Sequence, residues 1–223
     1  SDLRPYHFSN KMIPILFQGI EKYCLLRTEK IIVTSESYIE DYYRKIKDRL
    51  NWYLLENKVS VNLTRPAAVT LNKVVIGYFG FIRCRKSLEV LLSVAEGNSQ
   101  FEIIIYGFFH SDLENWKNRL VSIKNISYGG TYHSPRDLEE IYSKINVSWI
   151  CYPYSNEMRG NWKHARTNRY YEAGFFKKPM IVREGTQDAK WVEKLDIGII
   201  VDLQNTNDVV CRLNHLSLES LDN

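Results

Sequence analysis

The 223-residue chain lacks several features that would place it in common classes of protein. No apolar run reaches the roughly 18 residues that a membrane-spanning helix needs, and the first residues do not form a signal peptide. Its four cysteines, Cys24, Cys84, Cys151 and Cys211, contain no C-x-x-C pair and no histidine at metal-ligand spacing. We therefore expect free thiols in a reducing compartment, which indicates a cytoplasmic protein.

The chain also lacks a large excess of either sign of charge. The chain has 30 Lys and Arg against 26 Asp and Glu, a formal net charge of +4. This excess is too small and too dispersed for a nucleic-acid-binding surface, which would need a dense basic stripe. It fits an anionic small molecule or an anionic membrane surface. The sequence has no Asp-x-Asp motif, and we predict no metal site.

From residue 74 onward, apolar runs alternate with amphipathic patterns. Short buried strands are expected at 74–79, 101–106, 125–128, 147–151, 180–182 and 198–201, and helices at 86–96 and 134–144. The second helix is expected to start with Ser134 as N-cap and Asp137 in its first turn. Nearly continuous apolar strands between helices predict an α/β, Rossmann-like parallel sheet with helices on both faces.

The N-terminal part has a different pattern. We expect an amphipathic helix at 11–27, a strand at 30–34, a tyrosine-rich helix at 36–47, a further short strand at 57–62 and a linker at 64–68. Such a helix-strand-helix segment cannot bury a core alone, so it must pack on something else. We therefore divide the chain into an N-terminal segment, 1–66, and a main domain, 67–223.

Ligands of open parallel α/β sheets bind at the carboxyl ends of the strands, beside helix N-termini. The first strand-to-helix junction contains Gly77 and Gly80, followed by Arg83, Arg85 and Lys86. Glycines permit a tight turn, and cations before a helix suit a diphosphate. The alternative is a solvated basic loop.

The next two junctions also contain glycine. Gly107 follows a strand, where it permits either a close approach or a simple turn. Gly129 and Gly130 precede Tyr132 and His133. A planar base could lie against this backbone and stack on Tyr132. His133 is more often a surface residue than a catalytic acid.

The fourth junction is the most informative. A helix that begins with Asn168, Arg169 and Glu172 places the arginine and the carboxylate on one face near its N-terminus. Arginine suits phosphate, and a carboxylate suits ribose because it accepts two O–H bonds. The alternative is an ion pair between Arg169 and Glu172 that stabilises the helix surface.

The stretch 125–202 resembles the C-terminal, donor-binding domain of GT-B glycosyltransferases, particularly the family-4-like group. The resemblance rests on Asn168-Arg169-Tyr170-Tyr171-Glu172-Ala173-Gly174, on the Lys178-Pro179 strand that follows, and on Tyr128-Gly129-Gly130. Residues 76–92 are similar to the family's first strand, phosphate loop and helix, while 21–37 are similar to the end of its N-terminal domain.

The resemblance implies roles for individual residues. Arg83 and Lys86 would hold the donor diphosphate, with Arg169 as a second phosphate contact. Tyr132 would lie near the base, and Glu172 would bind the ribose. Gly80, Gly107, Gly130, His164 and Asn168 would line the donor site.

The sequence departs from the family's pattern at one position. The family often has a sugar-contacting glutamate eight residues before the one that aligns with Glu172, and this chain has His164 there. Glu157 is a possible substitute for the missing carboxylate. The residues that contact the sugar therefore stay open.

The resemblance also implies a reaction. A sugar would pass from a nucleotide diphosphate sugar, which is a substrate and not a cofactor, to a hydroxyl of a glycan or lipid-linked acceptor, without a metal ion. The acceptor-binding N-terminal domain would be largely absent, as in a fragment or a natural half. Alternatives are a non-catalytic nucleotide-binding module and a nucleotide-sugar epimerase.

Residues 38–53 could touch the inner face of a membrane, although a solvated helix face explains them better.

Overall fold

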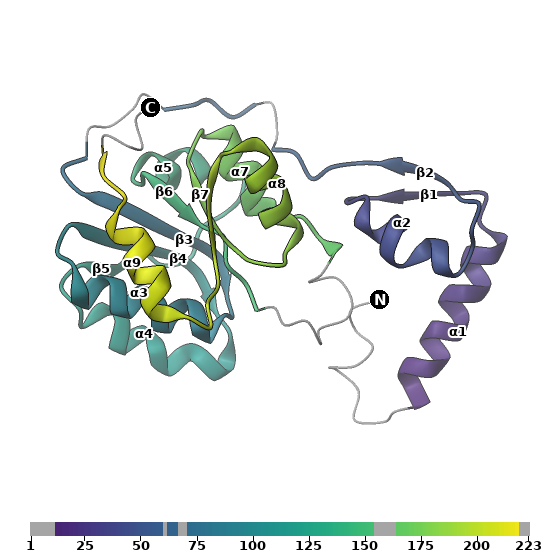
Figure 1. Cartoon of the computed structure of the whole chain (residues 1–223), viewed down its shortest axis with the longest axis horizontal. Coiled ribbons are helices and arrows are strands. Elements are labelled where there is room, and N and C mark those ends of the chain that lie inside the picture. Colours follow the sequence, from purple (N-terminus) through teal and green to yellow (C-terminus); the bar gives the residue numbers. More distant parts are fainter. Residues whose placement is uncertain (1–11, 60–61, 67–70, 154–163, 219–223) are drawn as a thin grey trace. The chain divides into compact units, whose positions relative to one another are not determined.

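The computed structural model describes residues 12–59, 62–66, 71–153 and 164–218, which form two compact units (Figure 1). The N-terminal unit comprises residues 1–57, 154–166 and 185–187. The sheet unit comprises residues 58–153, 167–184 and 188–223. The division of the chain into domains at residue 66 stays a prediction.

The sheet unit contains six parallel strands in the order β5-β4-β3-β6-β7-β8. They are β3 (Val74–Ile82), β4 (Phe101–Phe109), β5 (Ile126–Tyr128), β6 (Val147–Trp149), β7 (Met180–Arg183) and β8 (Gly198–Val201). The expected Rossmann-like α/β sheet is confirmed. Five of its strands are shifted or resized by a few residues, and β3 and β4 are the most extended because they continue to pair with each other beyond the rest of the sheet.

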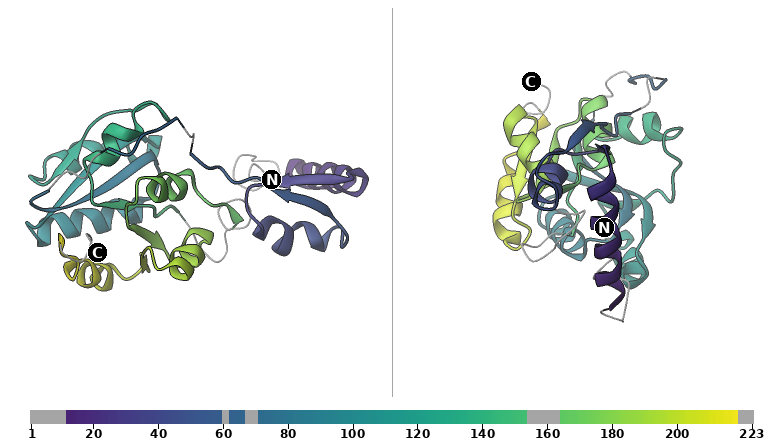
Figure 2. Two further views of the ribbon diagram at one scale, coloured as in Figure 1. Left: turned by 90° about the horizontal axis from the view of Figure 1, so that it is seen from above. Right: turned by 90° about the vertical axis from the view of Figure 1, so that its right-hand side faces the viewer.

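Helices cover both faces of this sheet, and Figure 2 gives further views of the layers. They are α3 (Arg85–Gly97), α4 (Glu114–Val121), α5 (Leu138–Ser143), α7 (Asn168–Phe175), α8 (Gln187–Leu195) and α9 (Thr206–Asn214), with a short 3-10 turn η2 (Ser111–Leu113). One core lies under α3, α4 and α9, and a second lies under α5, α7 and α8. Helix α3 contributes Leu88, Leu91 and Leu92 to the first core, as its apolar spacing predicts.

The N-terminal unit consists of α1 (Met12–Arg27), β1 (Lys30–Val33), α2 (Ser37–Asp41), a 3-10 turn η1 (Tyr43–Lys45) and β2 (Asn51–Leu54). Strands β1 and β2 pair in parallel. The prediction of one helix over 36–47 is wrong, because the backbone leaves the helical region at Tyr42, whose hydroxyl donates to Glu21 Oε2 at 2.7 Å. The second strand lies at 51–54, because these residues form the ladder with β1. Of the strand expected at 57–62, residues 57–59 and 62 are not in a strand, and residues 60–61 lie outside the described residues.

Helix α5 begins later than expected. Its first helical residue is Leu138, and Ser134 lies in the preceding turn. The carboxylate of Asp137 accepts the backbone N–H of His133 at 2.7 Å and a bond from Arg136. Asp137 therefore stabilises a turn before the helix and does not lie inside its first turn.

Helix α1 is apolar over most of its circumference, with Gln18, Glu21 and Lys22 on one side, yet its apolar side is exposed in the structure. Its exposed large side chains are Ile15, Leu16, Phe17, Ile20, Tyr23 and Leu26. Leu25 is its buried apolar residue among those whose side chains the structure describes. Among the described residues, no helix is long and apolar enough to cross a membrane.

Candidate functional site

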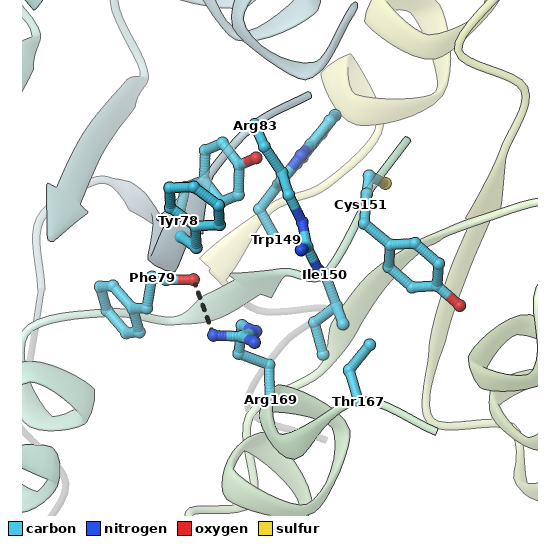
Figure 3. Close-up of a pocket in the computed structure, with 10 residues that line it drawn as sticks. Tyr78, Phe79, Arg83, Trp149, Ile150, Cys151, Thr167 and Arg169 are labelled. Carbon is cyan, nitrogen blue, oxygen red and sulfur yellow. Dashed lines mark hydrogen bonds between the residues drawn. The ribbon is translucent and has the colours of Figure 1, made fainter. Parts of the chain in front are cut away.

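A shallow pocket lies at the carboxyl ends of β3 and β6 (Figure 3). These two strands are neighbours in the sheet although residues 77–146 separate their first paired positions, Ile76 and Val147. The direction of strand order reverses here, which is where open α/β sheets bind ligands. The pocket is lined by Tyr78, Phe79, Phe81, Arg83, Trp149, Ile150, Cys151, Tyr152, Thr167 and Arg169.

Gly80 makes room for an arginine of the same chain. Its φ is +100°, and a Cβ at this position would overlap the guanidinium of Arg169. The Arg169 Nη1 donates to the backbone oxygen of Phe79 at 3.4 Å, as Figure 3 shows. The close approach that the glycine permits is therefore that of Arg169, which is held against the end of β3.

Gly107 continues this arrangement on the neighbouring strand. It pairs with Gly80 in register, its φ is +132°, and a Cβ there would overlap the Gly80 carbonyl. Its N–H donates to the Gly130 oxygen at 2.8 Å. A Cβ on Gly130, whose φ is +88°, would meet no described atom within 4 Å. Of the three predicted glycines, Gly130 is therefore the one with open space beside its Cα.

The three cations after β3 take different positions. Arg83 lines the pocket, and its guanidinium carbon lies 5.6 Å from the centroid of the Phe81 ring. Lys86 Nζ pairs with Glu89 Oε2 at 3.0 Å, and Arg85 Nε pairs with Glu89 Oε1 at 3.3 Å. Arg83 is thus brought to the pocket together with Arg169, whereas Lys86 interacts along α3.

Glu172 is a buried carboxylate on α7, with 6% of its surface exposed. Its Oε2 accepts a hydrogen bond from the Tyr142 hydroxyl at 3.2 Å. Burial raises the pKa of Glu172, while the charge of Arg169 and the bond from Tyr142 act in the opposite direction. The carboxylate is therefore desolvated but has partners that favour its charged form.

Tyr132 belongs to the same electrostatic group. Burial and then the negative charge of Glu172 raise the pKa of Tyr132 to about 12, against the opposing effect of Arg169. Its ring lies edge-on to Phe79, with centroids 6.4 Å apart. The structure thus brings together Tyr132, Arg169 and Glu172, three of the residues that the sequence singles out.

The first turn of α7 is fixed by its N-cap. Thr167 Oγ1 accepts the N–H of Tyr170 at 3.3 Å and donates to Asp188 Oδ2 at 2.7 Å. The Thr167 N–H donates to Asp188 Oδ1 at 3.1 Å, and Asp188 is fully buried. Because Thr167 lines the pocket, this clamp directs the N-terminus of α7, with its partial positive charge, toward the pocket.

The remaining candidates lie elsewhere. Asn168 is exposed at the first position of α7. His164 belongs to the N-terminal unit, where it is buried and its Nδ1 lies 2.9 Å from Ser37 Oγ. Glu157 lies outside the described residues. Roles for Asn168 and His164 in donor binding stay predictions.

Sequence reasoning missed Tyr142 and Asp188. Tyr142 sits at helical spacing with Leu138 and Ile141, so it has the pattern of a core residue. Asp188 is acidic in the first turn of α8, which is an ordinary helix-starting position. The sequence did offer a signal for Asp188, because this carboxylate lies on the same side of the amphipathic helix α8 as the buried Ala189 and Val192. No group of metal-ligating side chains occurs among the described residues.

The comparisons with known proteins show what the chain is similar to. No family model matches it. The chain is 27% identical over 187 residues to the succinoglycan biosynthesis protein ExoL of Rhizobium meliloti, a match that covers 77% of this chain and 45% of ExoL. The chain thus spans about half the length of this curated relative.

Solved structures share the fold. HepE from Anabaena, in complex with UDP, has a TM-score of 0.67 at 15% identity, with 96% of this chain and 59% of HepE covered. A variant of TarM from S. aureus, solved with Fondaparinux, alpha-GlcNAc-glycerol and UDP, has a TM-score of 0.64 at 15% identity, with 92% and 40% covered. Sucrose-phosphate synthase from Thermosynechococcus elongatus has a TM-score of 0.62 at 16% identity, with 96% and 55% covered. The resemblance to the GT-B fold is confirmed at the level of fold.

Proposed function

We propose that the chain is the donor-binding part of a glycosyltransferase, which transfers a sugar from a nucleoside diphosphate sugar to an acceptor hydroxyl. The observation that carries the proposal is the pair Arg83 and Arg169 at the carboxyl edge of the sheet, with the buried carboxylate of Glu172 beside Arg169. This arrangement offers cations for a diphosphate and an acceptor for ribose hydroxyls at the switch point of the strand order.

The nucleoside would bind at Glu172, Tyr132 and Gly130. A charged Glu172 accepts hydrogen bonds from two ribose hydroxyls at once, which a neutral carboxyl does less well. The open space at Gly130 lets a base approach the backbone. Tyr132, held edge-on to Phe79, limits the position of the base.

The diphosphate would bind at Arg83, Arg169 and the N-terminus of α7. When the nucleotide leaves, negative charge develops on its terminal phosphate. Fixed cations stabilise this charge without a cost of reorganisation at the moment of reaction, so the proposal requires no metal ion. Gly80 and the Phe79 carbonyl keep Arg169 in place. Lys86 contributes at longer range.

The relatives support a more specific form of the proposal. HepE and TarM were solved with UDP, which favours a uridine nucleotide as donor carrier. ExoL is a succinoglycan biosynthesis protein, which favours a role in polysaccharide or glycolipid biosynthesis. Most contacts to the acceptor, a glycan or a lipid-linked glycan, would come from a further domain in the part of these relatives that the chain does not span. We propose that the reaction takes place in the cytoplasm.

Calorimetric titration of the chain with UDP, GDP, ADP, CDP and uridine tests the proposal. We expect saturable binding of UDP, weakened about 10- to 100-fold in Arg83→Ala or Arg169→Ala, because each loses a charge-assisted hydrogen bond worth about 1.5–3 kcal/mol. Uridine affinity should change little in both variants. Arg119→Ala, which removes an exposed cation on α4, is the matched control.

Failure of every nucleotide to bind a folded sample would refute the donor site. Release of glucose from UDP-glucose by the full-length protein separates an enzyme from a non-catalytic module of the same fold. Epimerisation of the sugar in the same assay would identify the epimerase alternative. No described residue favours either alternative over sugar transfer.

A further inference from the structure

Two phenylalanines are exposed beside the candidate donor pocket. Strands β3 and β6 pair as far as Tyr78 and Trp149, whereas β3 and β4 continue to pair as far as Ile82 and Phe109. In this extension Phe81 lies opposite Phe108 in register. Their exposed fractions are 46% and 62%.

The two rings project from the same side of this extension. The next residues on each strand, Ile82 and Phe109, are both buried in the core under α3, α4 and α9. Because successive side chains of a strand point to opposite faces, Phe81 and Phe108 point to the other face, the side of Phe79. We call Phe81 and Phe108 the aromatic ledge.

The ledge is unusual within its unit. Among the described residues of the sheet unit, the exposed large apolar side chains are Phe81, Phe108, Val121 and Leu195. Val121 and Leu195 are single side chains on the separate helices α4 and α8, and such isolated exposure is ordinary. Two exposed rings on adjacent strands beside a pocket indicate a surface that binds a ligand.

Polar groups border the ledge. The Arg83 guanidinium carbon lies 5.6 Å from the Phe81 ring centroid, and the His110 ring lies 5.8 Å from it. Phe81 and Arg83 both line the pocket, so the ledge continues directly from it. An apolar platform with hydrogen-bonding groups at its border matches a pyranose ring, whose C–H face is apolar and whose hydroxyls project from its edge.

The order of residues along β3 points in the same direction. Phe79 contacts Tyr132 on the nucleoside side, and Gly80 accommodates Arg169. Phe81 follows Phe79 on the same face, two residues or about 6.6 Å along the strand. A nucleotide sugar has the same order of groups: nucleoside, diphosphate, sugar. With the diphosphate on the arginines, a sugar ring would lie next to Phe81.

We propose that Phe81 and Phe108 form a carbohydrate-binding site on which the apolar face of a pyranose ring stacks, with Arg83 and His110 bonding to its hydroxyls. The inference rests on the proposed function, since the sugar belongs to either the donor or the acceptor. A protein partner fits less well, because two side chains supply far less than the roughly 1,000 Å² that a specific protein interface buries.

The test compares Phe108→Ser and Phe81→Ser with Phe108→Trp, which keeps an aromatic ring, and with Leu195→Ser, a matched control that is 51% exposed on α8. Calorimetry gives the affinities of each protein for UDP and UDP-glucose. Saturation-transfer NMR with lactose reports binding of a free pyranose. Melting temperatures check that each variant is folded.

If the donor sugar occupies the ledge, the ratio of UDP-glucose affinity to UDP affinity falls about two- to tenfold in both serine variants. Phe108→Ser, which lies outside the lining of the pocket, keeps its UDP affinity. If an acceptor sugar occupies it, the lactose signal falls in the serine variants and the UDP-glucose to UDP ratio stays constant. In both cases Phe108→Trp and Leu195→Ser should behave as the unchanged protein does.

Serine variants that are folded and change neither the affinity ratio nor the lactose signal would overturn the proposal. So would an unchanged protein that binds UDP-glucose no better than UDP and gives no lactose signal. Failure of the proposed function is a separate result, namely no UDP binding. In that case lactose binding still decides for or against the ledge.

Discussion

The sheet unit and the N-terminal unit contain the same kinds of elements, parallel strands joined through helices, but they bury them differently. In the sheet unit, both faces of six strands are covered, and Leu88 and Leu91 of α3 are fully buried. In the N-terminal unit, two strands pair alone, and α1 exposes Leu16 at 64% and Ile15 at 62%.

The difference teaches how to interpret an apolar helix. Helix α3 has one apolar side, and that side meets the sheet. Helix α1 has a broad apolar side of the kind that helices normally bury, and that side is exposed. A pair of strands is also marginal as an independent structure. In the sheet unit the apolar side chains that the sequence places on one side of a helix are buried, whereas in the N-terminal unit they are exposed.

The same substitution in the two helices should give the largest contrast. We expect Leu91→Ala in α3 to lower the free energy of unfolding by about 2–5 kcal/mol, because it leaves a cavity in a packed core. Leu16→Ala in α1 should change it by less than about 0.5 kcal/mol, because that side chain is already exposed. Urea unfolding followed by circular dichroism measures both. An equal cost at the two positions would mean that α1 is covered in solution.

A second contrast lies within the sheet unit, between Gly80 and Gly130. Alanine at either position is strained by a positive φ, at a cost of about 1–2 kcal/mol of stability. Only Gly80→Ala also overlaps Arg169. We expect Gly80→Ala to weaken UDP binding about tenfold or more, in the range of a lost charge-assisted bond, with uridine binding preserved. If Gly130→Ala weakened UDP and uridine equally, that would support the base contact proposed there.

Burial of charge, unlike burial of leucine, should lower the stability of the sheet unit. Because burial raises the pKa of Glu172, the folded state binds its proton more tightly than the unfolded state. Stability therefore falls as pH rises from the unfolded pKa through the raised folded pKa, and the cost is complete above it. Glu172→Gln removes this cost, so its melting temperature should exceed that of the unchanged protein at neutral pH. The two values should converge in acid, and a constant difference across pH would contradict the desolvation of Glu172.

Substitution of an exposed cation on the sheet unit should have the smallest effect of all. Lys86 pairs with Glu89 on an exposed part of α3, and such pairs contribute about 0.2–1 kcal/mol. We expect Lys86→Ala to reduce UDP affinity by a factor below about five, which is less than the loss expected for Arg83→Ala. Calorimetry at two salt concentrations checks this order. A larger loss for Lys86→Ala would restore the role that the family resemblance implies for it.

Much of the sheet unit could be predicted from sequence, because its strands are short apolar runs between amphipathic helices. The strand Gly198–Val201 was predicted with the bounds that are observed. Helix α3 was predicted at 86–96, one residue shorter at each end than it is. The N-terminal unit was harder. The Asn51–Leu54 strand carries no alternation of burial, and its strand character comes from pairing with β1.

The candidate site was predictable in part. Arg83, Arg169 and Glu172 stood out because they lie at strand-to-helix junctions, where open parallel sheets bind ligands. The use of Gly80 could not be predicted, because its neighbour Arg169 lies far along the chain and meets it only in the fold. Asp188 escaped notice for the same reason, since its partner Thr167 belongs to another helix.

The pairing of β3 with β6 has a consequence for how the chain folds. Val147 can join Ile76 only after the segment 77–146 has closed into a loop, whereas β3 meets β4 after a single helix. Closure of a long loop loses more chain entropy than closure of a short one, and pairings distant in sequence form slowly. The pocket has one wall from each of these strands, so it belongs to the late-forming part of the sheet. A nascent chain that has emerged only through β4 carries Arg83, Gly80 and Gly107 but lacks Trp149, Thr167 and Arg169, so its candidate pocket is incomplete.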